Sequence, residues 1–142
     1  MTAKEYLSQA YYLDVRIKSD LDELSELRKM VSRISAPNLE PNYNPNHSSE
    51  APFVKELEAV WRLEEKIHTE IDNLSSIKAT IHEVIDEVEE HDRQMLLRYR
   101  YVHLDSWETI AAKMHYSNRW VHTLHGRALR SAEVILKRRG LI

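Results

Sequence analysis

With 142 residues, the chain is long enough for one ordinary domain or two small ones. It contains no cysteine, which excludes disulfides and thiolate metal sites, and its two glycines and four prolines favour an all-α fold. The net charge of −3 is distributed unevenly along the chain. Residues 1–90 carry 10 Lys/Arg and 19 Asp/Glu, a net charge of −9, whereas residues 91–142 carry 10 and 4, a net charge of +6. We therefore predict an acidic domain at 1–90 and a basic one at 91–142, where a polyanion would bind.

Two long helices are predicted in the acidic part. Apolar residues recur every three or four positions over residues 3–34, which predicts one helix, with Thr2 and Glu5 as its capping box. A second stripe of the same kind predicts a helix over residues 53–90. Residues 35–52 between them are rich in Pro, Asn and Ser and are predicted to form a long loop.

The stripes of these two helices are heptad-like, which predicts a long antiparallel, coiled-coil-like hairpin. Apolar residues outside the stripes, such as Tyr11, Tyr12 and Leu63, would be covered if two copies formed a four-helix arrangement, so we expect a homodimer. The acidic residues near 86–90 are interpreted as a solvated face rather than a metal site.

Shorter helices are predicted in the basic part. Asp92 is expected to cap the first of them, and Ser117 the last. For the helix between them, the sequence offers either Asp105 with Glu108, or Ser106 alone. Apolar positions on the last two helices face one another across a turn of a few residues, which predicts a helix pair joined at a steep angle.

The outward face of the last predicted helix carries mostly hydrogen-bond donors and no acid. It consists of Asn118, Arg119, His122, Thr123, Arg127 and Arg130. The major groove of DNA presents acceptors on its base edges and is flanked by phosphates, so this face suits duplex DNA.

The run from Ser106 to Arg130 resembles the helix-turn-helix of region 4 of bacterial sigma factors. It contains, without a gap, a Ser cap, a Glu, an Ile-Ala pair, a short turn, a second Ser cap and a basic helix that ends in Ala-Leu-Arg. The preceding residues 95–101, Met-Leu-Leu-Arg-Tyr-Arg-Tyr, resemble the first helix of that region. The two-part layout is similar to small regulators of phages and prophages of Gram-positive bacteria, of the ArpU and RinA kind.

This resemblance implies that the chain binds double-stranded DNA through its last helix. Ser117 is implied to cap that helix close to a phosphate. Four side chains are implied to read bases or the adjacent backbone: Asn118, Arg119, His122 and Thr123. Two further side chains are implied to contact phosphates: Arg127 and Arg130.

Two positions depart from the family's pattern. His115 stands in the turn where many helix-turn-helix proteins have Gly, so we expect it to adopt a left-handed conformation. Trp120 stands at a position that is often polar. It is expected to pack against the hairpin or a dimer partner, or else to contact a sugar or a thymine methyl group. With no segment for a sigma region 2, we expect DNA recognition without promoter opening.

No motif of an enzyme or of a cofactor site is present, and no cofactor is expected. His122 and His125 are three residues apart on a helix, but a zinc site needs a third protein ligand, so no metal is expected either. The first residues lack the basic and apolar regions of a signal peptide, and no apolar stretch approaches the ~18 residues of a membrane span. We expect a cytoplasmic protein that does not contact membranes.

Three functions fit these observations. The leading hypothesis is a phage-type transcriptional regulator that binds promoter-region DNA and uses its hairpin to dimerise or to contact RNA polymerase. The second is a DNA-packaging protein like a terminase small subunit, which also joins a helix-turn-helix to oligomerising helices. The third is an interaction module whose basic helix binds a protein, such as a polymerase subunit, and which never touches DNA.

Overall fold

The computed structural model describes residues 1–35 and 50–142, except for the side chains of residues 35 and 50–53. Every regular element in that part of the chain is a helix, so the predicted all-α class is confirmed. None of the helices described there is long and apolar enough to cross a membrane. The predicted loop at 35–52 falls largely outside the described residues.

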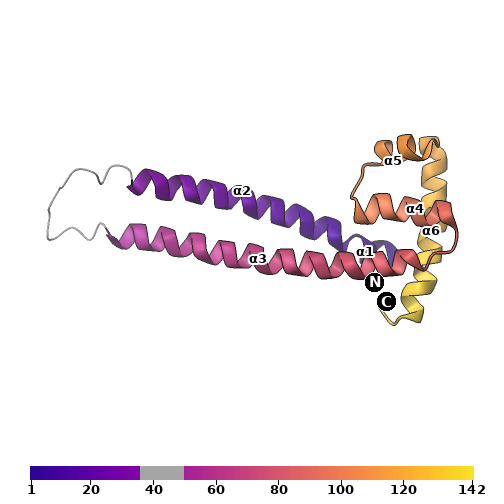
Figure 1. Ribbon diagram of the computed structural model, residues 1–142, viewed down its shortest axis with the longest axis horizontal. Coiled ribbons are helices and arrows are strands. Elements are labelled where there is room, and N and C mark those ends of the chain that lie inside the picture. The colour runs from indigo at the N-terminus through magenta and orange to yellow at the C-terminus, as the bar shows by residue number, and fades with distance from the viewer. Residues whose placement is uncertain (36–49) are drawn as a thin grey trace. The chain divides into compact units, whose positions relative to one another are not determined.

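The chain divides into two compact units. One unit joins Met1–Asp14 to Asn73–Ile142, and the other is Val15–Asp72. The domain ranges 1–90 and 91–142 stay a prediction. In Figure 1 the helices can be followed in chain order by their labels.

In the unit Val15–Asp72, helices α2 (Gln9–Ser35) and α3 (Glu50–Asp86) run antiparallel. Arg28 pairs with Glu64 at 2.7 Å, and Asp20 lies 3.5 Å from Lys66, so residue numbers fall along α2 as they rise along α3. Apolar side chains from both helices form the buried seam between them: Leu24, Val60, Leu63 and Ile67. The prediction that Leu63 lies outside the apolar stripe is therefore wrong.

Two carboxylates interrupt this apolar seam. Asp20 and Glu70 are only 7% and 8% exposed, and each has one carboxylate oxygen without a hydrogen-bond partner. Lys66 approaches them at 3.5 and 3.9 Å from a largely exposed position. Burial and the neighbouring Asp20 raise the pKa of Glu70, because both disfavour a second negative charge at that place.

The other unit begins with α1 (Ala3–Leu7), where the predicted capping box is confirmed. The Thr2 hydroxyl accepts from the Glu5 N–H at 3.1 Å, and the Glu5 carboxylate accepts from the Thr2 N–H at 2.8 Å. The predicted single helix over 3–34 is interrupted at Ser8, whose N–H bonds the carbonyls of Lys4 and Tyr6. That tightened turn ends α1 and lets α2 start one residue later.

The end of α3 also differs from the prediction. The second long helix spans Glu50–Asp86 rather than 53–90, because the N–H groups of Glu87 and Val88 bond carbonyls only three residues back. The chain then turns into α4 (His91–Leu97) and a short π-helix, η2 (Arg98–Val102), which the sequence analysis did not predict.

Two helices complete this unit: α5 (Trp107–Met114) and α6 (Asn118–Arg138). The C-terminal half of α6 packs with α1, the end of α3 and η2 in one apolar core. Residues that are almost fully buried in it include Leu7, Ile81, Ile85, Leu97, Ala128 and Leu136. The same helix that carries the predicted DNA-facing residues is therefore also part of the core.

Candidate nucleic-acid interface

Serine side chains cap both α5 and α6. Ser106 Oγ accepts from the Thr109 N–H at 3.2 Å, and Ser117 Oγ accepts from the Trp120 N–H at 3.2 Å. Of the two predicted alternatives for α5, Ser106 is the one observed. Asp105 caps no helix; its carboxylate binds Lys113 Nζ at 2.8 Å.

The turn between α5 and α6 spans three residues, 115–117. His115 adopts the left-handed conformation that was predicted for it, with φ 58° and ψ 39°. The Tyr116 N–H then bonds the Ala111 carbonyl at 3.1 Å, which closes the end of α5. Below the turn, one buried cluster joins three helices: Leu96, Ile110, Ala111, Val121 and Leu124.

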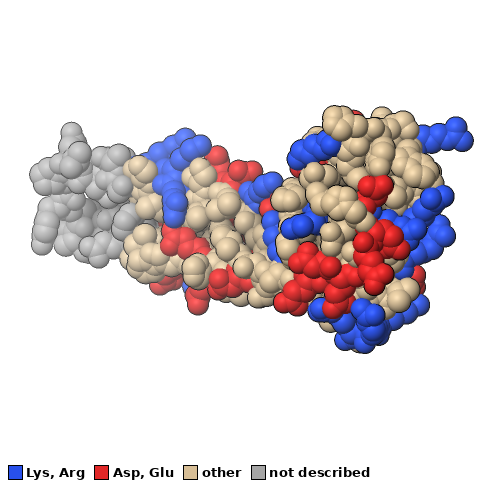
Figure 2. Space-filling view, turned by 45° about the vertical axis from the view of Figure 1, so that its right-hand side comes forward, with Lys and Arg blue, Asp and Glu red and all other residues tan. Residues whose placement is uncertain are grey.

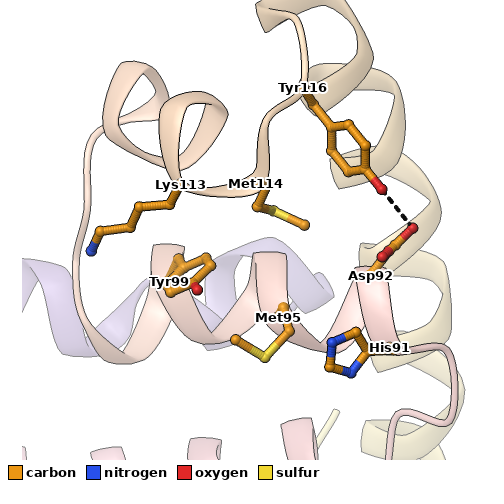
Figure 3. A pocket seen from close by; sticks show the side chains of 7 residues that line it. All are labelled: His91, Asp92, Met95, Tyr99, Lys113, Met114 and Tyr116. Carbon is orange, nitrogen blue, oxygen red and sulfur yellow. Dashed lines mark hydrogen bonds between the residues drawn. The ribbon is translucent and has the colours of Figure 1, made fainter.

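A pocket of about 200 Å³ lies beside this turn, between α4 and α5 (Figure 3). The Tyr116 hydroxyl donates to Asp92 at 2.9 Å across its rim, and this bond raises the pKa of Tyr116. The prediction that Asp92 caps α4 is wrong, because Glu90 occupies the cap position and no side chain bonds there. Asp92 instead ties α4 to the turn that precedes α6. On the other side of the pocket, Lys113 Nζ lies 5.1 Å from the centre of the Tyr99 ring.

All seven residues predicted to contact DNA are exposed in the structure: Ser117, Asn118, Arg119, His122, Thr123, Arg127 and Arg130. They follow helical spacing, and the opposite side of α6 is buried through Val121, Leu124 and Ala128. The Thr123 hydroxyl donates to the Arg119 carbonyl at 3.2 Å, so its oxygen is left to accept a hydrogen bond from a ligand. We call these seven exposed residues the α6 face.

The three cations at the C-terminal end of the chain are neutralised by acids. Arg138 and Arg139 both bind the carboxylate of Glu87, at 2.9 and 2.6 Å. The hydrogen bond from Arg139 and, to a smaller extent, the one from Arg138 lower the pKa of Glu87. Lys137 pairs with Glu133 at 2.9 Å. Figure 2 shows acidic and basic side chains meeting in this part of the unit.

The arginines of the α6 face are in a different electrostatic situation. Among the described residues, no carboxylate lies at ion-pair distance from Arg119, Arg127 or Arg130. The positive charge that remains uncompensated on α6 is therefore on the face that was predicted from sequence.

Aromatic rings hold parts of this face in place. The Arg127 guanidinium lies 5.2 Å from the centre of the Trp120 ring, and Trp120 meets Tyr116 edge-on. His122 lies 5.2 Å from the centre of the Trp107 ring. Trp120 is thus a support for Arg127, a role that the sequence analysis missed. Its predicted contact with DNA or with a second copy stays a prediction.

His125 is a residue on α6 whose packing role the sequence analysis missed. Its Nε2 lies 2.7 Å from the Tyr101 hydroxyl, and its ring packs against Trp107. Burial, followed by the positive charges of Lys4 and Arg100, lowers the pKa of His125 to about 4. The signal was its spacing: it follows Val121 by four residues, and so falls on the buried side of the helix. His125 fixes α6 against η2.

Nothing in the described part of the chain brings three or more His, Cys, Asp or Glu side chains together in a way that could hold a metal ion. The two histidines considered for a metal, His122 and His125, differ in environment, since one is exposed and the other buried.

Comparisons with known proteins gave no match to a family model, to a curated protein or to a solved structure. The resemblance to sigma-factor region 4 therefore stays a prediction from the residues quoted above.

Proposed function

We propose that this chain is a sequence-specific DNA-binding regulator of transcription, of phage type, in which α5 and α6 act as a sigma-region-4-like helix-turn-helix. In this proposal α6 is the recognition helix in the major groove, and α2 and α3 form a long antiparallel hairpin that precedes it in the chain. The observation that carries the proposal is the α6 face. It exposes three arginines without carboxylate partners, next to amide, imidazole and hydroxyl groups.

The residues of the α6 face divide by their distance from the start of the helix. Asn118 and Arg119 lie in its first turn, where a recognition helix meets base edges. Arg119 has the geometry for two hydrogen bonds to guanine, and Asn118 for two to adenine. Arg127 and Arg130 lie two to three turns further on and are assigned to phosphates, which any sequence presents. Arg127 reaches that position with its guanidinium on the Trp120 ring.

The first step of the test is a selection of bound duplexes from a random library, followed by fluorescence anisotropy with the selected site at several salt concentrations. Arg119→Ala should weaken binding to the selected site by about 5- to 150-fold, equivalent to ~1–3 kcal/mol, with a much smaller effect on random duplex. Arg127→Ala should weaken both by a similar factor and reduce the salt slope by about 1.

Lys137→Ala is the matched control, because it removes the same charge from the same helix at a position already paired with Glu133. It should change affinity little. If the full-length chain showed no salt-sensitive binding to any duplex, DNA binding would be refuted and the protein-binding hypothesis preferred. If Lys137→Ala weakened binding as much as Arg119→Ala, net charge rather than the α6 face would be responsible.

A further inference from the structure

The unit Val15–Asp72 has two lateral flanks, and only one of them is rich in exposed apolar side chains. The Arg28–Glu64 ion pair bridges α2 and α3 along the first flank. Leu21 lies seven residues before Arg28, and Ile71 lies seven after Glu64, so all four share that flank. Leu21 and Ile71 are each 45% exposed. Trp61, one turn before Glu64, is 58% exposed and extends the same surface.

The second flank carries charged side chains at its outer positions. A shallow groove there has Leu27, Ala59 and Leu63 at the edge of the seam, and Glu23, Arg62 and Lys66 around them. Met30 lies seven residues after Glu23 and is the exposed apolar side chain of this flank, again at 45%. Exposed large apolar residues are therefore concentrated on the first flank, which we call the Trp61 flank.

The Trp61 flank is complementary to itself. On α3 it carries Glu64 and, seven residues later, Ile71, and at the same levels on α2 it carries Arg28 and Leu21. A two-fold axis parallel to the helices would place α2 of one copy over α3 of the other at the same level. Arg28 of one copy would then lie beside Glu64 of the other, and Leu21 beside Ile71. Opposite charges and apolar contacts would coincide in this one arrangement.

From these observations we propose that the Trp61 flank is the interface of a homodimer, in which two α2–α3 pairs form a four-helix bundle about an axis parallel to the helices. The proposal does not depend on DNA binding. The stretch from Trp61 to Ile71, extended by one turn at each end, is ~26 Å long, and two helices are ~20 Å wide. That footprint of roughly 500 Å² per copy is below the ~800 Å² of a standard interface, so the expected dimer dissociates in the micromolar range.

Sedimentation velocity over a range of protein concentrations, with the full chain, tests the proposal. The wild type should shift from monomer to dimer as concentration rises through the micromolar range. Leu21→Glu should remain monomeric at concentrations where the wild type is dimeric. Met30→Glu is its control, because it makes the same kind of change at equal exposure on the same helix, and it should dimerise like the wild type. Circular dichroism shows whether each variant keeps its helices.

Because the chain has no cysteine, single cysteines also report the symmetry. Ser25→Cys and His68→Cys lie on the Trp61 flank at matching levels of α2 and α3. A mixture of the two variants should cross-link with a short bis-maleimide far better than either variant alone. A folded protein that stays monomeric at all concentrations would overturn the proposal. So would equal disruption by Leu21→Glu and Met30→Glu, or efficient cross-linking of Ser25→Cys with itself.

Discussion

Asp20 and Glu70 form a buried carboxylate pair in the α2–α3 seam. Most substitutions of buried residues lower stability, but we predict that one substitution in this pair raises it. Glu70→Gln keeps the size of the side chain but removes its charge, and the new amide can donate to Asp20. Glu70 Oε2 has no hydrogen-bond partner, and Asp20 Oδ2 has only Lys66 Nζ at 3.5 Å. A buried polar group in that state costs about 1–3 kcal/mol. We therefore expect Glu70→Gln to raise the free energy of unfolding by about 1–2 kcal/mol at pH 7.

The sign of the pH dependence follows from the raised pKa of Glu70. A carboxyl group with a raised pKa in the folded state contributes most to stability when it is protonated, below its unfolded pKa of ~4.3. That contribution is lost as the pH rises through the folded-state value. The advantage of Glu70→Gln should therefore be full at pH 7 and disappear near pH 4.

Urea unfolding followed by circular dichroism, at equal protein concentration for every variant, measures this difference. Glu65→Gln is the control, because it makes the same change on an exposed side chain of the same helix. It should leave the unfolding midpoint almost unchanged. If Glu70→Gln were less stable than the wild type at pH 7, the contacts of ionised Glu70 with Lys66 would outweigh its burial, and the reasoning would be refuted.

Three further predictions concern the second unit, each measured by urea unfolding. Ser117→Ala removes the cap of α6 and should cost about 1 kcal/mol, whereas Ser117→Asp should restore most of it; equal stability of all three proteins would contradict the assigned cap. His115→Gly should keep or raise stability, and His115→Val should lower it by about 1–2 kcal/mol, because His115 has a positive φ. His125 has a lowered pKa of about 4, so its contribution is complete above pH ~6.5 and is lost as the pH falls toward 4. His125→Phe should therefore lose less stability than the wild type over that range, and parallel pH profiles would contradict the assignment.

The sequence predicted best where one physical rule dominated. Helical periodicity identified the helices. The caps at Thr2 and Ser117 were predicted, and Ser106 was one of two predicted alternatives, because a cap involves residues only three apart. The left-handed conformation of His115 was predicted because His115 stands where many helix-turn-helix proteins have Gly. The exposure of the α6 face followed from the same periodicity that buried the other side of the helix.

Features that depend on distant residues were missed. The sequence pattern predicts Asp92 as a helix cap, but its carboxylate accepts a hydrogen bond from Tyr116, 24 residues further on. Asp86 ends α3 early, and the next residue, Glu87, binds two arginines more than 50 residues away. No local pattern contains such partners. His125 is different, because its burial could have been predicted from its helical spacing alone.

Helix α6 runs for 21 residues, or ~31 Å, from the exposed α6 face to the core around Leu136. It is held at both ends, because Val121 and Leu124 near its start pack in one buried cluster and Leu136 near its end packs in the other. A tilt of ~5° about the end near Leu136 would still move Asn118 by ~2 Å, most of the length of a hydrogen bond. The packing of α1 and the Glu87–Arg139 ion pair at that end therefore contribute to the position of side chains several turns away. Variants at that end should alter ligand discrimination without touching a ligand.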